Sequence, residues 1–121
     1  MAKFIVGIDA GTTGLKTMIF ELNGNPVAHA YRGYPCTFPN AGWVEQNPWD
    51  LWNALCETSK EAIAKAGIDP KEIGSIAISS QRGTFFAIDK DWNPIEDAIV
   101  WSDVRATKEA QWIGEHFGID K

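Results

Sequence analysis

The first candidate ligand site is residues 9–16, DAGTTGLK, a glycine- and threonine-rich turn flanked by charged residues. Its candidate ligand groups are Asp9, Gly11, Thr12, Thr13 and Lys16. Glycines let a backbone approach a charged oxygen closely, and a turn can aim its N–H groups at that oxygen. A lone carboxylate such as Asp9 can hold Mg2+ through water, since this ion keeps several waters. The segment therefore suits a phosphate and Mg2+, although a plain hairpin turn with Asp9 bonded to backbone amides explains the same residues.

Two further polar segments have groups that suit the hydroxyls of a sugar. Residues 79–84, SSQRGT, offer the amide of Gln81 and the five N–H donors of Arg82. Residues 101–105, WSDVR, offer the aromatic face of Trp101 and the carboxylate of Asp103. The alternatives are an arginine paired with a surface carboxylate, and a core tryptophan followed by a helix cap.

Alternating and continuous apolar runs predict the elements that must position these groups. Strands are expected at 3–9, 15–22 and 26–34, joined by tight turns into an antiparallel opening, because the glycine and asparagine of Asn23-Gly24-Asn25 favour a hairpin. We expect a further buried strand at 73–80, another strand at 84–89 and a short extended segment at 98–101. Residues 34–46 have the composition of a loop.

Two helices are predicted from capping residues and apolar spacing. Asn47 is a suitable N-cap with Pro48 at the first helical position, and Gly67 ends this helix at residue 66. Its apolar face should consist of Trp49, Trp52, Leu55, Cys56, Ile63 and Ala66. Asp103 is expected to cap the second helix, whose apolar stripe should consist of Ala106, Ala110, Ile113 and Phe117 before Gly118. The order of strands and helices predicts an α/β layer fold in one domain, residues 1–121, that ends early.

Composition excludes several function classes. The 121 residues have a formal net charge of −5 and no basic run, so a general nucleic-acid binder is not expected. Apolar runs are much shorter than the roughly 20 residues of a bilayer span, so no membrane partner and a cytoplasmic location are expected.

Taken together and in order, the motifs resemble the N-terminal part of the FGGY carbohydrate kinases, a group that contains glycerol kinases, xylulokinases and gluconokinases. The resemblance rests on GIDAGTTGLKTMIFELNGNPV, GWVEQNPWDLW, ISSQRGTFFAID and WNPIEDAIVWSDVRA, and it spans nearly the whole chain. It implies a ribonuclease H-like (actin-like ATPase) fold with a mixed sheet. It also implies ATP-dependent transfer of a phosphoryl group to a sugar or polyol.

The resemblance assigns a role to each candidate residue. Asp9 belongs to the Mg2+ and phosphate site, and the phosphate loop comprises Gly11, Thr12, Thr13 and Lys16. The sugar is approached by Gln81, Arg82, Trp101 and Asp103. Gly83 stands where glycerol kinases have an acidic residue and xylulokinases a histidine, so the sugar is not specified. The family's general base and adenine-binding second domain are expected beyond these 121 residues, and the segment alone is expected to be inactive.

Two other hypotheses are consistent with the sequence. A non-catalytic fragment or scaffold could fold and self-associate, for example as a homodimer, through surface that other segments would cover. A ribonuclease H-type nuclease would share the opening strands and Asp9, with Glu57 or Glu61 as a second carboxylate. Such nucleases need a carboxylate cluster and a basic surface. The net charge of −5 does not favour the basic surface.

Overall fold

A four-stranded sheet forms the centre of the chain, with its strands in the order β3 (Pro26–Gly33), β2 (Gly14–Glu21), β1 (Phe4–Ala10) and β5 (Ile73–Ser80). The computed structural model describes residues 1–118, so the last three residues of the predicted domain lie outside the described part. Strands β1, β2 and β3 are antiparallel neighbours, whereas β5 is parallel to β1. The elements are β1 Phe4–Ala10, β2 Gly14–Glu21, β3 Pro26–Gly33, β4 Glu45–Gln46, α1 Pro48–Ala66, a 3-10 turn η1 Pro70–Glu72, β5 Ile73–Ser80, β6 Ala98–Ile99 and α2 Thr107–Phe117. The predicted antiparallel opening is confirmed.

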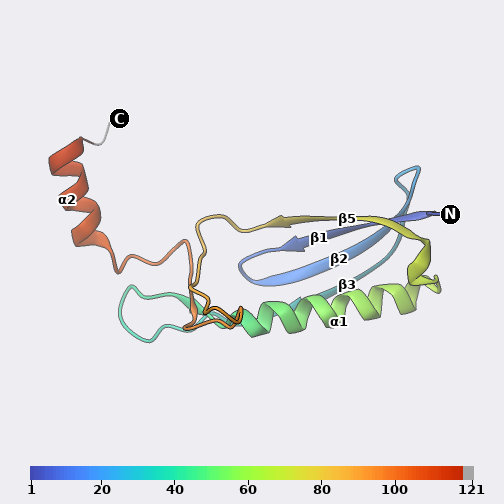
Figure 1. Ribbon diagram of the computed structural model, residues 1–121, viewed down its shortest axis with the longest axis horizontal. Helices are drawn as coiled ribbons and strands as arrows, with labels where there is room; N and C mark the ends of the chain where they lie inside the picture. Colours follow the sequence, from blue (N-terminus) through green and yellow to red (C-terminus); the bar gives the residue numbers. More distant parts are fainter. Residues whose placement is uncertain (119–121) are drawn as a thin grey trace.

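Helix α1 begins and ends at the predicted residues and packs on one face of the sheet (Figure 1). The side chain of Asn47 accepts a hydrogen bond from the Trp49 N–H, and Gly67 ends the helix with a left-handed φ of 64°. The predicted apolar face of α1 is confirmed in part. Leu55, Ile63 and Ala66 pack against the core, whereas Trp49 and Trp52 are exposed. The fully buried residues of the helix are Ala54, Thr58 and Ala62. Small residues let the helix lie close to β2 and β3, and the two indoles remain at its edge.

The core between α1 and the sheet contains one buried polar pair. The hydroxyls of Thr17 on β2 and Thr58 on α1 lie 2.8 Å apart, and Thr58 also donates to the carbonyl of Ala54 at 2.8 Å. The single hydrogen of Thr58 is thereby used, so Thr17 must be the donor within the pair. Thr58 accepts that bond.

We predict unequal effects of removing the two hydroxyls. Thr58→Val leaves a buried Thr17 donor without a partner and should lower the free energy of unfolding by about 1–3 kcal/mol. Thr17→Val leaves Thr58 bonded to Ala54 and should cost about 1 kcal/mol or less. Urea unfolding of both variants measures the difference. Equal costs would contradict the assigned direction of the bond.

Strand β5 is exposed, so its predicted burial is wrong. Seven of its eight residues are exposed, including Ile76 at 63% and Ile78 at 64%. Figure 1 shows α1 lying along β2 and β3, and within residues 1–118 no element covers β5. An apolar run predicted the strand correctly, but its burial depends on which other elements lie over it.

The segment after β5 differs from the prediction in two places. The expected strand at 84–89 is wrong, because this stretch makes only isolated bridges, from Phe85 to Ile99 and from Ile88 to Pro94. The Asp89 side chain accepts from the backbone N–H of Asp91 and Asn93, which holds a turn instead. The predicted loop at 34–46 contains β4, which pairs with β6.

Helix α2 starts four residues after its predicted cap. Its N-cap is Ala106, which makes no side-chain cap, and the carboxylate of Asp103 is occupied by other donors. None of its residues is buried, and it stands apart from the sheet in Figure 1. The predicted apolar stripe therefore lies on a helix without a packing partner in the described residues. Nowhere in residues 1–118 is there a helix long and apolar enough to cross a membrane.

Candidate functional site

The candidate phosphate turn connects β1 to β2 and is fixed by backbone hydrogen bonds. The Gly11 N–H donates to the carbonyl of Gly14 at 3.0 Å, and the Tyr34 hydroxyl donates to the carbonyl of Gly11 at 2.6 Å. Burial raises the pKa of Tyr34 to about 12, so its hydroxyl stays a donor at neutral pH. A side chain at Gly14 would clash with the phenol of Tyr31, so this glycine is required for packing against β3.

Asp9 and Lys16 lie side by side on the sheet face opposite α1. They are register partners between β1 and β2, and Ser79 of β5 is the partner of Asp9 on its other side. All three line a hollow of about 380 Å³. Within residues 1–118 the Asp9 carboxylate accepts no hydrogen bond and forms no ion pair. The alternative in which Asp9 holds backbone amides of the turn is therefore not what the structure shows.

The second and third predicted segments meet the phosphate turn through a chain of hydrogen bonds. The Thr12 hydroxyl donates to Oε1 of Gln81 at 3.1 Å and accepts from the indole N–H of Trp101 at 3.0 Å. The Thr84 hydroxyl also donates to Oε1 of Gln81, at 3.0 Å, and accepts from the backbone N–H of Trp101 at 3.2 Å. Trp101 is thus held at two N–H groups although its residue is 61% exposed.

Arg82 differs from the other arginines of the chain. Arg32 pairs with Glu57 and Glu61 on α1. Arg105 pairs likewise with two carboxylates, whereas Arg82 is exposed and makes no ion pair in residues 1–118. The alternative of an arginine neutralised by a surface carboxylate is not observed, and its donors remain available to a ligand.

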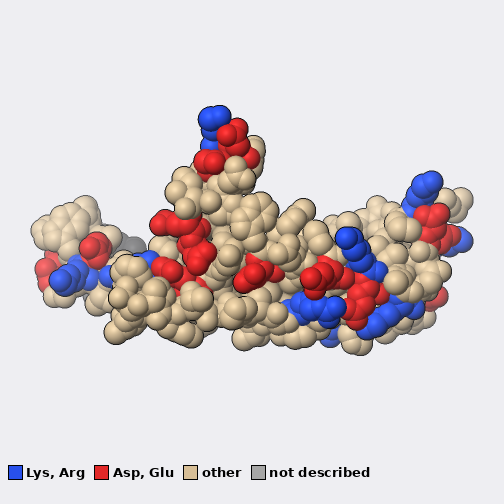
Figure 2. Space-filling view, turned by 90° about the horizontal axis from the view of Figure 1, so that it is seen from below, with Lys and Arg blue, Asp and Glu red and all other residues tan. Residues whose placement is uncertain are grey.

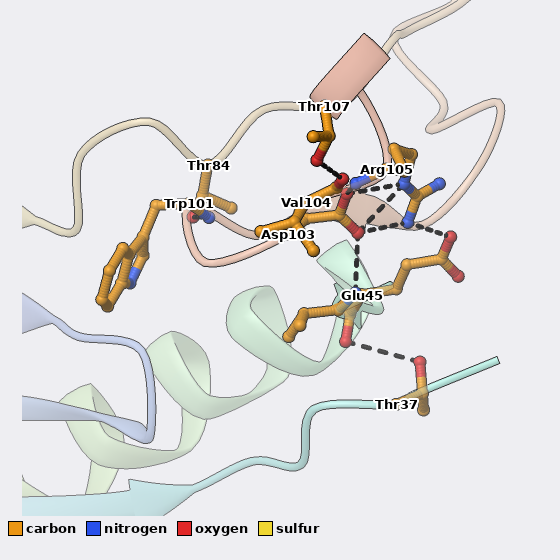
Figure 3. Close-up of polar contacts among 9 residues, drawn as sticks. Thr37, Glu45, Thr84, Trp101, Asp103, Val104, Arg105 and Thr107 are labelled. Atoms are coloured by element: carbon orange, nitrogen blue, oxygen red, sulfur yellow. Dashed lines mark hydrogen bonds and ion pairs between the residues drawn. The ribbon is translucent and has the colours of Figure 1, made fainter. Parts of the chain in front are cut away.

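Asp103 lies outside the Thr12, Gln81 and Trp101 cluster. Its side chain is 3% exposed, and its oxygens accept from the Arg105 guanidinium and from the Val44 N–H at 2.7 Å. Arg105 also pairs with Glu45 at 2.7 Å and stacks over the Trp43 ring. The guanidinium bonds hold the pKa of Asp103 well below its ordinary value. Figure 3 shows the Trp101 indole pointing away from this pair.

An apolar groove opens beside the network, between the start of α1 and the end of β5. Its volume is about 590 Å³, and its wall includes Trp49, Trp52, Ile78, Phe86 and Trp92, with Gln81 and Thr84 at the polar end. Of these tryptophans, Trp49 and Trp52 were predicted on the packed apolar face of α1. In the structure they form an open apolar surface next to the candidate sugar site.

Charged side chains give no support to the nuclease hypothesis. Figure 2 shows basic and acidic groups intermixed on the face that carries α1, rather than a broad basic surface. Glu57 and Glu61 are both bonded to Arg32, at 2.9 and 2.7 Å. In the described part of the chain, no three His, Cys, Asp or Glu residues are grouped as a metal cluster would require.

Gln46 is the site residue that the sequence did not reveal. It is 1% exposed, its Nε2 donates to the Thr12 carbonyl, and its Oε1 accepts from Nε2 of Gln81 at 2.9 Å. Its partners are 34 and 35 residues away in sequence, so no local spacing indicates the contact.

Comparison with known proteins places these features in a family. Residues 4–121 match the "FGGY family of carbohydrate kinases, N-terminal domain". The chain is 36% identical to a glycerol kinase of Thermococcus kodakarensis over 118 residues, which is 98% of this chain and 24% of that protein. It is 43% identical to glycerol kinase 1 of Lactiplantibacillus plantarum over 100 residues, 82% of this chain and 20% of that protein.

The fold is shared with solved kinases. A gluconate kinase structure from Lactobacillus acidophilus superposes with a TM-score of 0.88 at 30% identity, covering 98% of this chain and 23% of that one. A xylulose kinase from the same organism gives a TM-score of 0.87 at 30% identity, covering 96% and 23%. The predicted actin-like ATPase fold is confirmed. The chain spans about a quarter of the length of these relatives.

Proposed function

Because the chain belongs to the FGGY family of carbohydrate kinases, we propose that it forms the phosphate turn and part of the acceptor-binding site of an ATP-dependent sugar or polyol kinase. The reaction is transfer of the γ-phosphoryl group of ATP to a hydroxyl of the acceptor. The general base and the adenine-binding domain would be supplied by residues outside these 121. The observation that carries the proposal is the hydrogen-bonded link from Thr12 of the turn to Gln81 and Trp101.

The phosphate side of the site consists of Gly11, Thr12, Thr13, Lys16 and Asp9. Lys16 offers a cation, and the turn offers backbone N–H groups, so negative charge on the transferred group is stabilised. The unbonded carboxylate of Asp9 fits a hydrated Mg2+, which needs only one or two protein carboxylates. When bound, this ion neutralises charge on the phosphates. Asp9 would hold the ion through its water shell.

The acceptor side of the site consists of Gln81, Arg82 and Trp101. The exposed ring of Trp101 gives the C–H face of a sugar or polyol a flat apolar surface. Arg82 and the remaining N–H of Gln81 donate to its oxygens. Asp103, whose oxygens are already used, holds the loop after Trp101 and does not contact the acceptor. Phosphoryl transfer needs little covalent chemistry from the protein, so positioning the hydroxyl against the phosphate supplies much of the rate.

An acceptor panel tests the proposal. We expect a full-length kinase that carries this chain as its N-terminal segment to phosphorylate at least one of glycerol, xylulose and gluconate with ATP. The 121-residue chain alone should show no turnover. Absence of turnover by the full-length protein with a broad set of pentoses, hexonates and polyols would contradict the proposal. In that case, dimers detected by light scattering would favour the non-catalytic alternative, in which the exposed β5 self-associates.

A further inference from the structure

Gln46 is a fully buried polar side chain to which the proposed mechanism gives no role. It lies at the end of β4, immediately before the N-cap of α1, and is 1% exposed. Its Nε2 donates to the Thr12 carbonyl and to Sγ of Cys36 at 3.4 Å. Both hydrogens of that nitrogen are therefore used. The side-chain oxygen of Gln46 must then be the atom that faces Gln81, and it accepts from Nε2 of Gln81.

The direction of this bond determines the direction of the bonds beyond it. Since Gln81 presents its nitrogen to Gln46, its oxygen must face Thr12 and Thr84. Both hydroxyls then have to donate to that oxygen, because a carbonyl oxygen only accepts. Each hydroxyl has lone pairs left, and these accept the two N–H groups of Trp101. If the Gln46 amide were flipped, its nitrogen would face Nε2 of Gln81, and this chain of hydrogen bonds would be broken at its first bond.

We infer that Gln46 is a positioning residue, which sets the amide orientation of Gln81 and, through Thr12 and Thr84, the orientation of the Trp101 ring. This inference rests on the proposed function, in which the Trp101 ring and the Gln81 amide bind the acceptor. It also gives Gln81 a defined chemistry. Its oxygen is occupied by two hydroxyls, so the group it offers the acceptor is the second hydrogen of Nε2, a donor.

The test compares Gln46→Glu with Gln111→Glu in the full-length kinase labelled with 5-fluorotryptophan. Gln46→Glu keeps the shape of the side chain, and its ionised form has no donor and places a negative charge against the Thr12 carbonyl. Because burial favours the protonated carboxyl, which can still donate, the variant is measured from neutral to alkaline pH, where the ionised form is favoured. Gln111 is an exposed α2 residue whose side chain, within residues 1–118, bonds only to Glu115, so the same chemical change there is the control. The Trp101 resonance is assigned by its loss in Trp101→Phe.

Gln46→Glu should shift or broaden the Trp101 resonance and raise the acceptor KM by about tenfold or more, with a smaller change in kcat. Gln111→Glu should change neither. An unchanged Trp101 resonance in folded Gln46→Glu would overturn the inference. If the proposed function itself fails, no acceptor is phosphorylated by the unmodified protein, whereas the resonance still reports on the network.

A second variant covers the case in which Gln46→Glu does not fold. Thr84→Val removes one of the two hydroxyls that relay the orientation of Gln81 to Trp101, at a half-buried surface position. It should displace the Trp101 resonance and raise the acceptor KM in the same direction. If both quantities stay at their wild-type values, Trp101 is not held by this network and the inference is wrong.

Discussion

Asp9→Asn should reduce ATP turnover of the full-length kinase by about 100-fold or more while leaving its Tm unchanged. The amide has the shape of the carboxylate but no charge to balance a hydrated cation beside the phosphates. Stability should not change, because in residues 1–118 the Asp9 side chain makes no hydrogen bond or ion pair that the substitution could break. Affinity for the acceptor should change little, since Trp101 and Arg82 remain in place.

Turnover and thermal unfolding of Asp9→Asn should be measured on the same preparation. Asp91→Asn is the matched control, because Asp91 is also an exposed carboxylate but lies in the 89–93 turn, where Lys90 is its only ion-pair partner among residues 1–118. The control should keep both turnover and Tm. A destabilised Asp9→Asn with wild-type turnover per folded molecule would refute the assigned role and restore a structural one.

Arg105→Met should cause the largest loss of stability among the variants considered. Arg105 joins Asp103, which is 3% exposed, to Glu45, and its removal leaves the Asp103 carboxylate with backbone donors alone. A carboxylate so enclosed is costly to leave without its cation. Methionine keeps part of the packing on Trp43, so the change isolates the charge. Lys3→Met is the control, because the Lys3–Glu72 pair is exposed and should contribute little.

The same pair predicts a dependence of stability on pH. The pKa of Asp103 is lower in the folded chain than its ordinary value of 3.8, so the folded state favours the ionised form. The ionised Asp103 contributes fully to the free energy of unfolding at pH values above 3.8, and this contribution is lost as the pH falls through the folded pKa. Arg105→Met and wild type should therefore keep a constant Tm difference well above pH 3.8 and come closer together as the pH is lowered below 3.8, in thermal unfolding followed from pH 7 down to about pH 2. A Tm difference that stays constant below pH 3.8 would contradict the assignment.

Local signals were enough to predict the opening sheet and α1. The turn at Asn23-Gly24-Asn25 and the Asn47 and Pro48 start each act within a few residues, so their effect can be judged without the fold. The burial of β5, which was predicted wrongly, and the pairing of β4 with β6, which was not predicted, both depend on distant segments. Asp103 was predicted as a helix cap because its partner Val44, 59 residues away, could not be inferred.

The candidate site shows the same division. The residue types of the turn, of Gln81 and Arg82, and of Trp101 indicated ligand chemistry separately, and the family resemblance joined them. Contact between Trp101 and Thr12 spans 89 residues, so only the folded chain brings the two groups to one place. Gln46 has an amide that any surface glutamine also has. Its role depends on its burial and on its hydrogen bonds to Thr12, Cys36 and Gln81, neither of which a sequence pattern indicates.

A crystal structure of the full-length kinase with its acceptor and a non-hydrolysable ATP analogue would show where both substrates lie relative to the phosphate turn and Trp101. We expect the γ-phosphate at the Gly11–Thr13 turn near Lys16. We expect the acceptor on the Trp101 ring, within hydrogen-bonding reach of Gln81 and Arg82. An acceptor bound elsewhere, with the Trp101 ring and the Arg82 guanidinium left in solvent, would contradict the proposed function.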